Sequence, residues 1–199
     1  MTAPVSQQII AVKEQRFVLP GRHSWKQFKE IQAVIGNVPG VRISYLDGRV
    51  ELMTIGEPHE NLKKNIAILL ELYFFEREIE FIPVGSATRE DESREVSFEP
   101  DESYYIGDKK DRPDLAVEVV ITSGGINKLE KYKRLKIAEV WFWEDNRLSL
   151  YRLRGEEYEQ LSRSEFLPEL DLDLLARCVI MPSRLESRRE FLNGMHRQV

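Results

Sequence analysis

The sequence contains one cysteine, no long apolar run and no excess of positive charge. Cys178 has no partner for a disulfide within the chain, which fits the reducing cytoplasm. No segment reaches the roughly 18 apolar residues that a membrane span requires. The first residues also lack the basic-then-apolar pattern of a secretion signal. These absences predict a cytoplasmic protein that does not enter a membrane.

The charge balance bears on which kinds of nucleic-acid-binding protein this chain could be. The net charge of −5 argues against a general coat protein for nucleic acid, because phosphate binding draws on Lys and Arg. It does not exclude an enzyme that acts on DNA, since such contact needs only a local basic surface.

The length and composition predict one domain with a substantial core, since 42% of the 199 residues are hydrophobic. We expect a loose lead-in over residues 1–16, a single domain over 17–180 and a C-terminal helical tail over 181–199. Three interpretations of that tail stay open: a partner helix, a DNA-facing segment and a frayed terminus.

Two helices are predicted in the first part of the chain. Ser24 opens one through a capping box, and Gly36 ends it after a stripe of apolar residues that we assign to the core. Pro58 begins a longer helix that reaches about Arg77, with apolar residues at helical spacing. His59 lies on the inward edge of that stripe. A histidine in this position is usually structural.

A hairpin is predicted between these helices. Asp47-Gly48 is typical of a two-residue turn, here between strands at 41–46 and 49–54. In that register Glu51 lies beside Ser44, on the face opposite the apolar residues. The simplest interpretation of Glu51 is a solvent-facing side chain.

The later elements follow similar local patterns. We expect an exposed acidic connection over 88–95, a strand over 139–143 and a hairpin formed by 147–154 and 157–161.

Two extended segments, 98–106 and 113–121, each carry an acid and read as strands. The second is almost continuously apolar, as in a strand covered on both faces. Glu118 interrupts it, and a buried carboxylate is costly unless it is paired or binds a metal. If the strands pair, Asp101 lies beside Glu118, and such oxygen ligands suit Mg²⁺ or Mn²⁺. Asp114 is roughly 13 Å along the strand from Glu118, too far to share one ion.

The order of these residues resembles the PD-(D/E)XK nuclease superfamily: an acid after proline, an acid within a hydrophobic strand, then a lysine. More closely, the segment from Glu99 to Trp143 resembles the bacterial Uma-two family, whose members are described as putative restriction endonucleases. The likeness extends from about Phe17 to about Cys178. It implies an α/β (α+β) fold with a restriction-endonuclease-like core, a central mixed β-sheet flanked by helices, and metal-dependent hydrolysis of phosphodiester bonds.

The resemblance also implies roles for individual residues. Asp101 and Glu118 are the expected metal ligands, and the backbone carbonyl of Val119 is a candidate for a further one. A histidine at the start of the long helix implies a place for His59 at the rim of the site, holding a phosphate or a metal-bound water. An acid after the hairpin turn implies that Glu51 is an outer acid of the site.

The position of the lysine departs from the superfamily pattern. Val120 stands two residues after the second acid, where the superfamily has lysine. The family resemblance places the lysine on the next helix, four residues before a tyrosine, and Lys128 and Tyr132 match that spacing. Lys131 is a second candidate. Gly124-Gly125 is expected to form a tight turn from strand to helix.

The predicted function is therefore a Mg²⁺- or Mn²⁺-dependent endonuclease acting on DNA. A homodimer is expected, because cutting both strands requires two active sites and twofold assembly is the commonest kind. An alternative is a catalytically degenerate nuclease fold that serves as a DNA-binding or protein-interaction module, which Val120 favours. A third is a structural acid pair neutralised by arginines, which would bind no metal.

Overall fold

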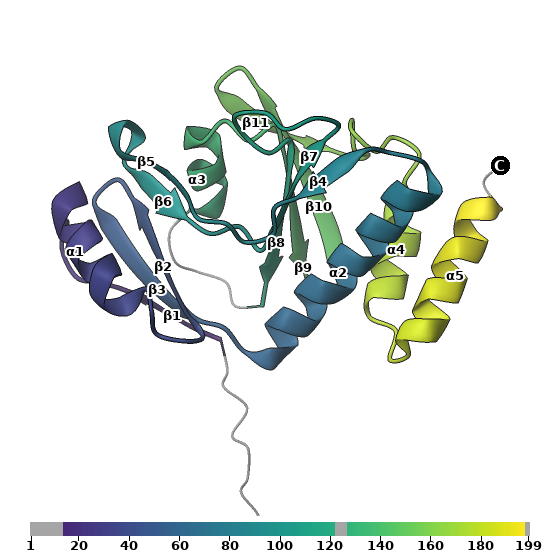
Figure 1. Cartoon of the computed structure of the whole chain (residues 1–199), viewed down its shortest axis with the longest axis horizontal. Coiled ribbons are helices and arrows are strands. Elements are labelled where there is room, and N and C mark those ends of the chain that lie inside the picture. Colours follow the sequence, from purple (N-terminus) through teal and green to yellow (C-terminus); the bar gives the residue numbers. More distant parts are fainter. Residues whose placement is uncertain (1–13, 122–126, 198–199) are drawn as a thin grey trace, which may run out of the picture.

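The computed structural model describes residues 14–121 and 127–197 and contains two β-sheets (Figure 1). The first sheet has the order β1-β3-β2-β6-β5 and the second β11-β10-β9-β8-β7-β4. The strands of the first sheet are β1 (Gln15–Val18), β2 (Val41–Leu46), β3 (Arg49–Thr54), β5 (Arg89–Asp91) and β6 (Val96–Phe98). Those of the second are β4 (Phe81–Pro83), β7 (Glu102–Ile106), β8 (Leu115–Val120), β9 (Glu139–Glu144), β10 (Arg147–Arg154) and β11 (Glu157–Leu161).

The helices cover both sheets. They are α1 (Trp25–Ile35), α2 (Glu57–Glu76), α3 (Lys128–Arg134), α4 (Leu172–Val179) and α5 (Arg184–His196), with a short 3₁₀ turn, η1, at Glu92–Arg94. In Figure 1, α1 lies outside the first sheet, whereas α2, α4 and α5 lie together on one side of the second. The predicted α/β class, with a mixed sheet flanked by helices, is confirmed. Among the helices that the structure describes, none is long and apolar enough to cross a membrane.

Strand β8 occupies the centre of the mixed sheet. It pairs antiparallel with β7 and parallel with β9, and α3 lies on the crossover between β8 and β9. Val117 and Val119 face a core shared with α2, whereas Ala116 packs with Tyr132 of α3 on the other face. Burial on both faces explains why this strand is almost continuously apolar.

The hairpin between β2 and β3 has the predicted register, with Ser44 opposite Glu51. The expectation that Glu51 faces solvent is wrong, because its side chain is only 3% exposed. The first sheet turns this face toward the second sheet and α3, where Arg16 and Lys131 lie close to the carboxylate. A polar strand face is thus an interior wall of the molecule.

The segment predicted as one strand over 98–106 is two strands in different sheets. Strand β6 ends at Phe98 and β7 begins at Glu102. Pro100 lies at the break and has no N–H to donate to a sheet ladder. Asp101 therefore lies where the chain passes between the sheets. The connection expected over 88–95 is also partly regular, since it contains β5 and η1.

The ends of the described chain are more ordered than the sequence indicated. Strand β1 begins at Gln15, inside the expected lead-in, and pairs with β3. Helix α5 places Phe191 and Met195 in the same core as α2 and α4, so this helix is part of the packed domain. The capping box of α1 is confirmed, but its core stripe is narrower than expected because Val34 is 77% exposed. The turn expected at Gly124-Gly125 lies outside the described residues.

Candidate active site

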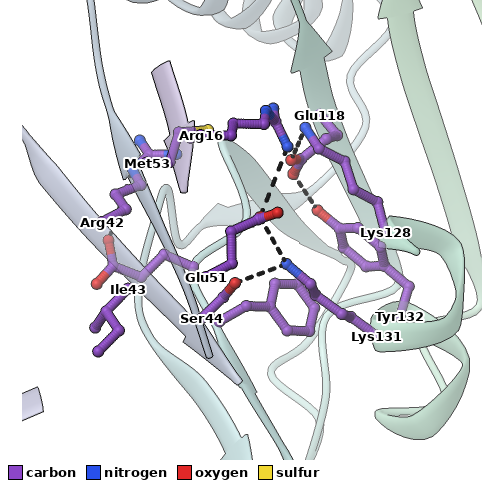
Figure 2. A pocket seen from close by; sticks show the side chains of 12 residues that line it. Arg16, Arg42, Ile43, Ser44, Glu51, Met53, Glu118, Lys128, Lys131 and Tyr132 are labelled. Carbon is purple, nitrogen blue, oxygen red and sulfur yellow. Dashed lines mark hydrogen bonds and ion pairs between the residues drawn. The ribbon is translucent and has the colours of Figure 1, made fainter. Parts of the chain in front are cut away.

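A small pocket lies between the first sheet, β8 and α3 (Figure 2). Its cavity volume is about 30 Å³, which is space for one or two water molecules. Most of the polar residues that line it carry charged side chains. The lining residues are Arg16, Arg42, Ile43, Ser44, Glu51, Met53, Phe98, Glu99, Glu118, Lys128, Lys131 and Tyr132.

Glu118 projects from the middle of β8 into this pocket and contacts two side chains of α3. Its Oε1 lies 2.6 Å from Lys128 Nζ, and its Oε2 accepts a hydrogen bond of 2.6 Å from the Tyr132 hydroxyl. Asn127 caps α3, which begins at Lys128. Lys128 and Tyr132 are four residues apart and therefore lie on one face of this helix. Burial and the Glu118 carboxylate raise the pKa of Tyr132 well above its ordinary value. The tyrosine therefore stays a hydrogen-bond donor to Glu118.

The ammonium of Lys128 is buried and lies within ion-pair distance of Glu118, but no acceptor among the described residues meets it in hydrogen-bonding geometry. The Lys128–Glu118 contact is therefore an electrostatic pair without hydrogen-bonding geometry. The N–H groups of Lys128 remain available to another acceptor.

Asp101 lies beside Glu118 but behind the pocket wall. Glu102 pairs with Val117 in an antiparallel ladder, so Asp101, which precedes Glu102, lies next to Glu118, which follows Val117. The Asp101 carboxylate is completely buried, and its Oδ2 accepts a hydrogen bond of 2.7 Å from the Val119 amide. The predicted proximity of the two acids is therefore present.

Two cationic side chains share the other oxygen of Asp101. Arg42 of β2 pairs with Oδ1, and His59 Nε2 lies 2.8 Å from the same oxygen. Burial alone would raise the pKa of Asp101, but His59, Arg42 and Lys128 outweigh it and hold the pKa well below its usual range. Asp101 is ionised in the folded protein.

His59 stands in the first turn of α2, with both ring nitrogens bound to carboxylates. Nδ1 lies 2.8 Å from Glu14 Oε2, and Nε2 contacts Asp101. Burial lowers the pKa of His59, but the hydrogen bonds to Asp101 and Glu14 together outweigh that effect and raise the pKa to about 9. The expected place at the rim is wrong for this arrangement, because the ring is completely buried behind Asp101.

Glu51 and Lys131 form the opposite wall. Lys131 Nζ donates a hydrogen bond of 2.8 Å to Ser44 Oγ and lies 3.7 Å from Glu51 Oε1. Arg16 approaches the same oxygen at 3.8 Å, so Figure 2 shows Glu51 between two cations. Burial lowers the pKa of Lys131 to about 8. The two candidate lysines thus differ in place, since Lys128 contacts Glu118 and Lys131 contacts Ser44.

Two further predicted positions have clear surroundings. Val119 packs its side chain into the core, and its amide holds Asp101. Asp114, expected to stand apart from the ion site, accepts hydrogen bonds from the Ile106 amide at 2.9 Å and from Lys110 Nζ at 2.7 Å. Those contacts close the loop between β7 and β8.

Comparison with known proteins identifies the family of this chain. The family model Uma2, described as “Putative restriction endonuclease”, matches residues 25–180, which is more than three quarters of the 199 residues. The chain belongs to the Uma2 family. A search of curated proteins found no match. The family supports a nuclease function and a DNA substrate, and its restriction-endonuclease-like class generally uses divalent metals.

The chemistry of the Uma2 site can be tested against such a metal. Among residues 14–121 and 127–197, no group of three or more His, Cys, Asp or Glu side chains is arranged to hold an ion. Mg²⁺, however, is commonly bound by one or two carboxylates together with waters and substrate phosphates. Glu118 presents such a carboxylate to the pocket, with the buried ammonium of Lys128 as its present counter-charge. The donors fit an ion that water and substrate complete.

Sequence reasoning missed three charged residues of this Uma2 site: Arg42, Arg16 and Glu14. Arg42 could have been found from the hairpin, because it lies two positions before Ser44 and so shares its face. Glu14 and Arg16 carry no local signal, since the first residues show no periodic pattern and β1 is defined only by its pairing with β3.

Proposed function

We propose that this Uma2 protein is a Mg²⁺- or Mn²⁺-dependent endonuclease that hydrolyses DNA phosphodiester bonds. The observation that carries the proposal is the pocket itself: a buried acid, Glu118, faces a cavity bordered by Arg16, Arg42, Lys128 and Lys131. A carboxylate suits a divalent cation, and a ring of cations suits a phosphate diester. We expect the enzyme to act as a homodimer in the cytoplasm, with one site for each DNA strand.

Glu118 would hold the metal from the pocket, and Asp101, which is paired with Arg42 and His59 behind the pocket wall, would be the second ligand, with the carbonyl of Val119 as a candidate further one. When bound, the ion lowers the pKa of a coordinated water and polarises the phosphate. Tyr132 keeps one oxygen of Glu118 in place, and the amide of Val119 does the same for Asp101. These donors fix the two acids before substrate arrives, which reduces the reorganisation that the reaction requires.

Lys128 is the better candidate for the lysine that assists the reaction. It lines the pocket beside Glu118, and its ammonium has donors free for a phosphate oxygen. A cation at that point offsets the charge that develops on the phosphate in the transition state. Lys131 instead hydrogen-bonds to Ser44 and supports Glu51, which we assign to the outer part of the site.

The proposal is tested by nicking of supercoiled plasmid with Mn²⁺, with Mg²⁺ and with EDTA. Glu118→Gln keeps the size of the side chain but removes its charge, and we expect nicking to fall on the order of 100-fold or more. Lys128→Met should also reduce nicking while Mn²⁺ binding, measured by calorimetry, persists. The matched control is Glu144→Gln on the neighbouring strand, where the side chain is exposed.

The outcomes separate the candidate functions. Metal-dependent nicking that is lost in Glu118→Gln but kept in Glu144→Gln supports the endonuclease. Equal nicking by all variants points to a contaminating nuclease. DNA binding without nicking by the folded wild-type protein would favour the degenerate module, for which Val120 at the lysine position of the superfamily is the specific observation. In that case Asp101→Ala should leave DNA affinity unchanged.

A further inference from the structure

Glu14 is a buried acid outside the part of the chain that the Uma2 model matches, which begins at residue 25. Its side chain is only 1% exposed, although it lies directly before β1 near the edge of the first sheet. Arg16 bonds its Oε1 at 3.0 Å, and His59 lies 2.8 Å from its Oε2. A buried carboxylate held at both oxygens calls for an explanation beyond the packing of a strand end.

The second partner leads directly to the proposed site. His59 contacts Glu14 through Nδ1 and Asp101 through Nε2, both at 2.8 Å. If both carboxylates are ionised they can only accept, and each ring nitrogen then carries a hydrogen. The pKa of His59, which the hydrogen bonds to Asp101 and Glu14 raise to about 9 against the effect of burial, favours this doubly protonated ring. The geometry is therefore carboxylate, imidazolium, carboxylate, buried from end to end.

We infer that Glu14 is a positioning residue for Asp101, acting through His59, so that the segment at the start of β1, outside the family-matched residues, supports the site. This inference rests on the proposed function for its catalytic consequence. A carboxylate that accepts the Nδ1 hydrogen fixes the orientation of the imidazole, so that Nε2 points at Asp101, which also accepts a hydrogen bond from the Val119 amide. Partners of this kind, one step removed from a metal ligand, typically change metal affinity or activity by roughly 10- to 100-fold.

The variants are Glu14→Ala, Glu14→Gln and the control Gln15→Ala, all in the full-length protein. Gln15 is the next residue and has an exposed side chain, so its truncation changes the strand without touching the bridge. Glutamine at position 14 can still accept a hydrogen bond from the His59 ring. It should therefore behave between the wild type and Glu14→Ala.

Three measurements are made on each folded variant. NMR of the His59 ring nitrogens reports whether both carry hydrogen, and the amide proton of Val119 reports the hydrogen bond to Asp101. Calorimetry with Mn²⁺ and the kcat and KM of nicking report the consequence for the site. For Glu14→Ala we expect loss of the Nδ1 proton signal, a shifted Val119 amide, and metal affinity and kcat lower by about 10- to 100-fold with KM little changed.

The results that overturn the inference are specific. A folded Glu14→Ala protein with the wild-type His59 and Val119 signals would show that Glu14 does not position Asp101. Lower stability with unchanged signals and unchanged Mn²⁺ affinity would assign it a purely structural role. If Glu14→Ala does not fold, Glu14→Gln decides by the same signals. Absence of metal binding and nicking in the wild type would refute the endonuclease, while the two NMR signals would still test the positioning of Asp101.

Discussion

The proton on His59 makes the stability of the metal-free protein depend on pH in a way that can be calculated. Burial lowers the pKa of His59, but its hydrogen bonds to Asp101 and Glu14 raise it to about 9 from an ordinary 6.5. The folded protein thus holds this proton more tightly than the unfolded chain. The resulting stabilisation is complete below about pH 6.5 and is lost as the pH rises through about 9.

The expected size is about 3 kcal/mol, since each pH unit between the two pKa values contributes about 1.4 kcal/mol. The assay is urea unfolding in EDTA from about pH 6 to about pH 9.5, followed by tryptophan fluorescence, for the wild type and His59→Gln. Relative to the variant, the wild type should lose about 3 kcal/mol of unfolding free energy across this range. Lys131 titrates in both proteins, so its effect cancels in the comparison.

Parallel pH profiles for the two proteins would refute the assignment of an imidazolium between two carboxylates. A wild-type profile that rises relative to the variant would mean that burial dominates and that the ring is neutral. Either result would remove the physical basis for the contact geometry at Glu14 and Asp101.

Three other predictions use contacts elsewhere in the molecule. Burial lowers the pKa of Lys131 to about 8, so the free energy of unfolding should rise between about pH 8 and about pH 10.5. Urea unfolding should show a rise on the order of 3 kcal/mol in the wild type and none from this group in Lys131→Met. Gly194→Ala would place a methyl group in steric overlap with Leu174 Cδ2, so urea unfolding should show a cost of about 1–3 kcal/mol. That cost should become smaller when the same change is made in a Leu174→Ala background, where the overlapping atoms are absent. Asp114→Asn keeps an acceptor for the Ile106 amide, so plasmid nicking should stay at the wild-type level. A loss of nicking as large as that expected for Glu118→Gln would instead give Asp114 a direct role.

Local patterns in the sequence predicted the elements that carry the site. The turn chemistry of Asp47-Gly48 fixed the register of the first hairpin, because a two-residue turn leaves one pairing. The apolar run around Glu118 identified a central strand, since only burial on both faces accounts for it. Pro58 predicted the start of α2 to within one residue. Each of these features depends on neighbours in sequence.

The features that were missed depend on how the two sheets meet. Alternation along β3 placed Glu51 opposite the apolar face, but whether that face meets water or another layer is decided by β8 and α3. Likewise, the residues on either side of Pro100 look like one strand by composition, yet they pair with different sheets. A second sheet closing over the first is a long-range event that no local pattern encodes.

The same closure explains how Asp101 remains ionised inside the protein. A buried charge is costly unless it is paired, and the partners come from several distant elements. Arg42 reaches Asp101 from β2, His59 reaches it from α2, and Lys128 reaches Glu118 from α3. An ionised carboxylate is the form that binds a divalent cation. The ion pairs that permit the sheets to close on charged residues therefore also keep Asp101 in the state that the proposed reaction requires.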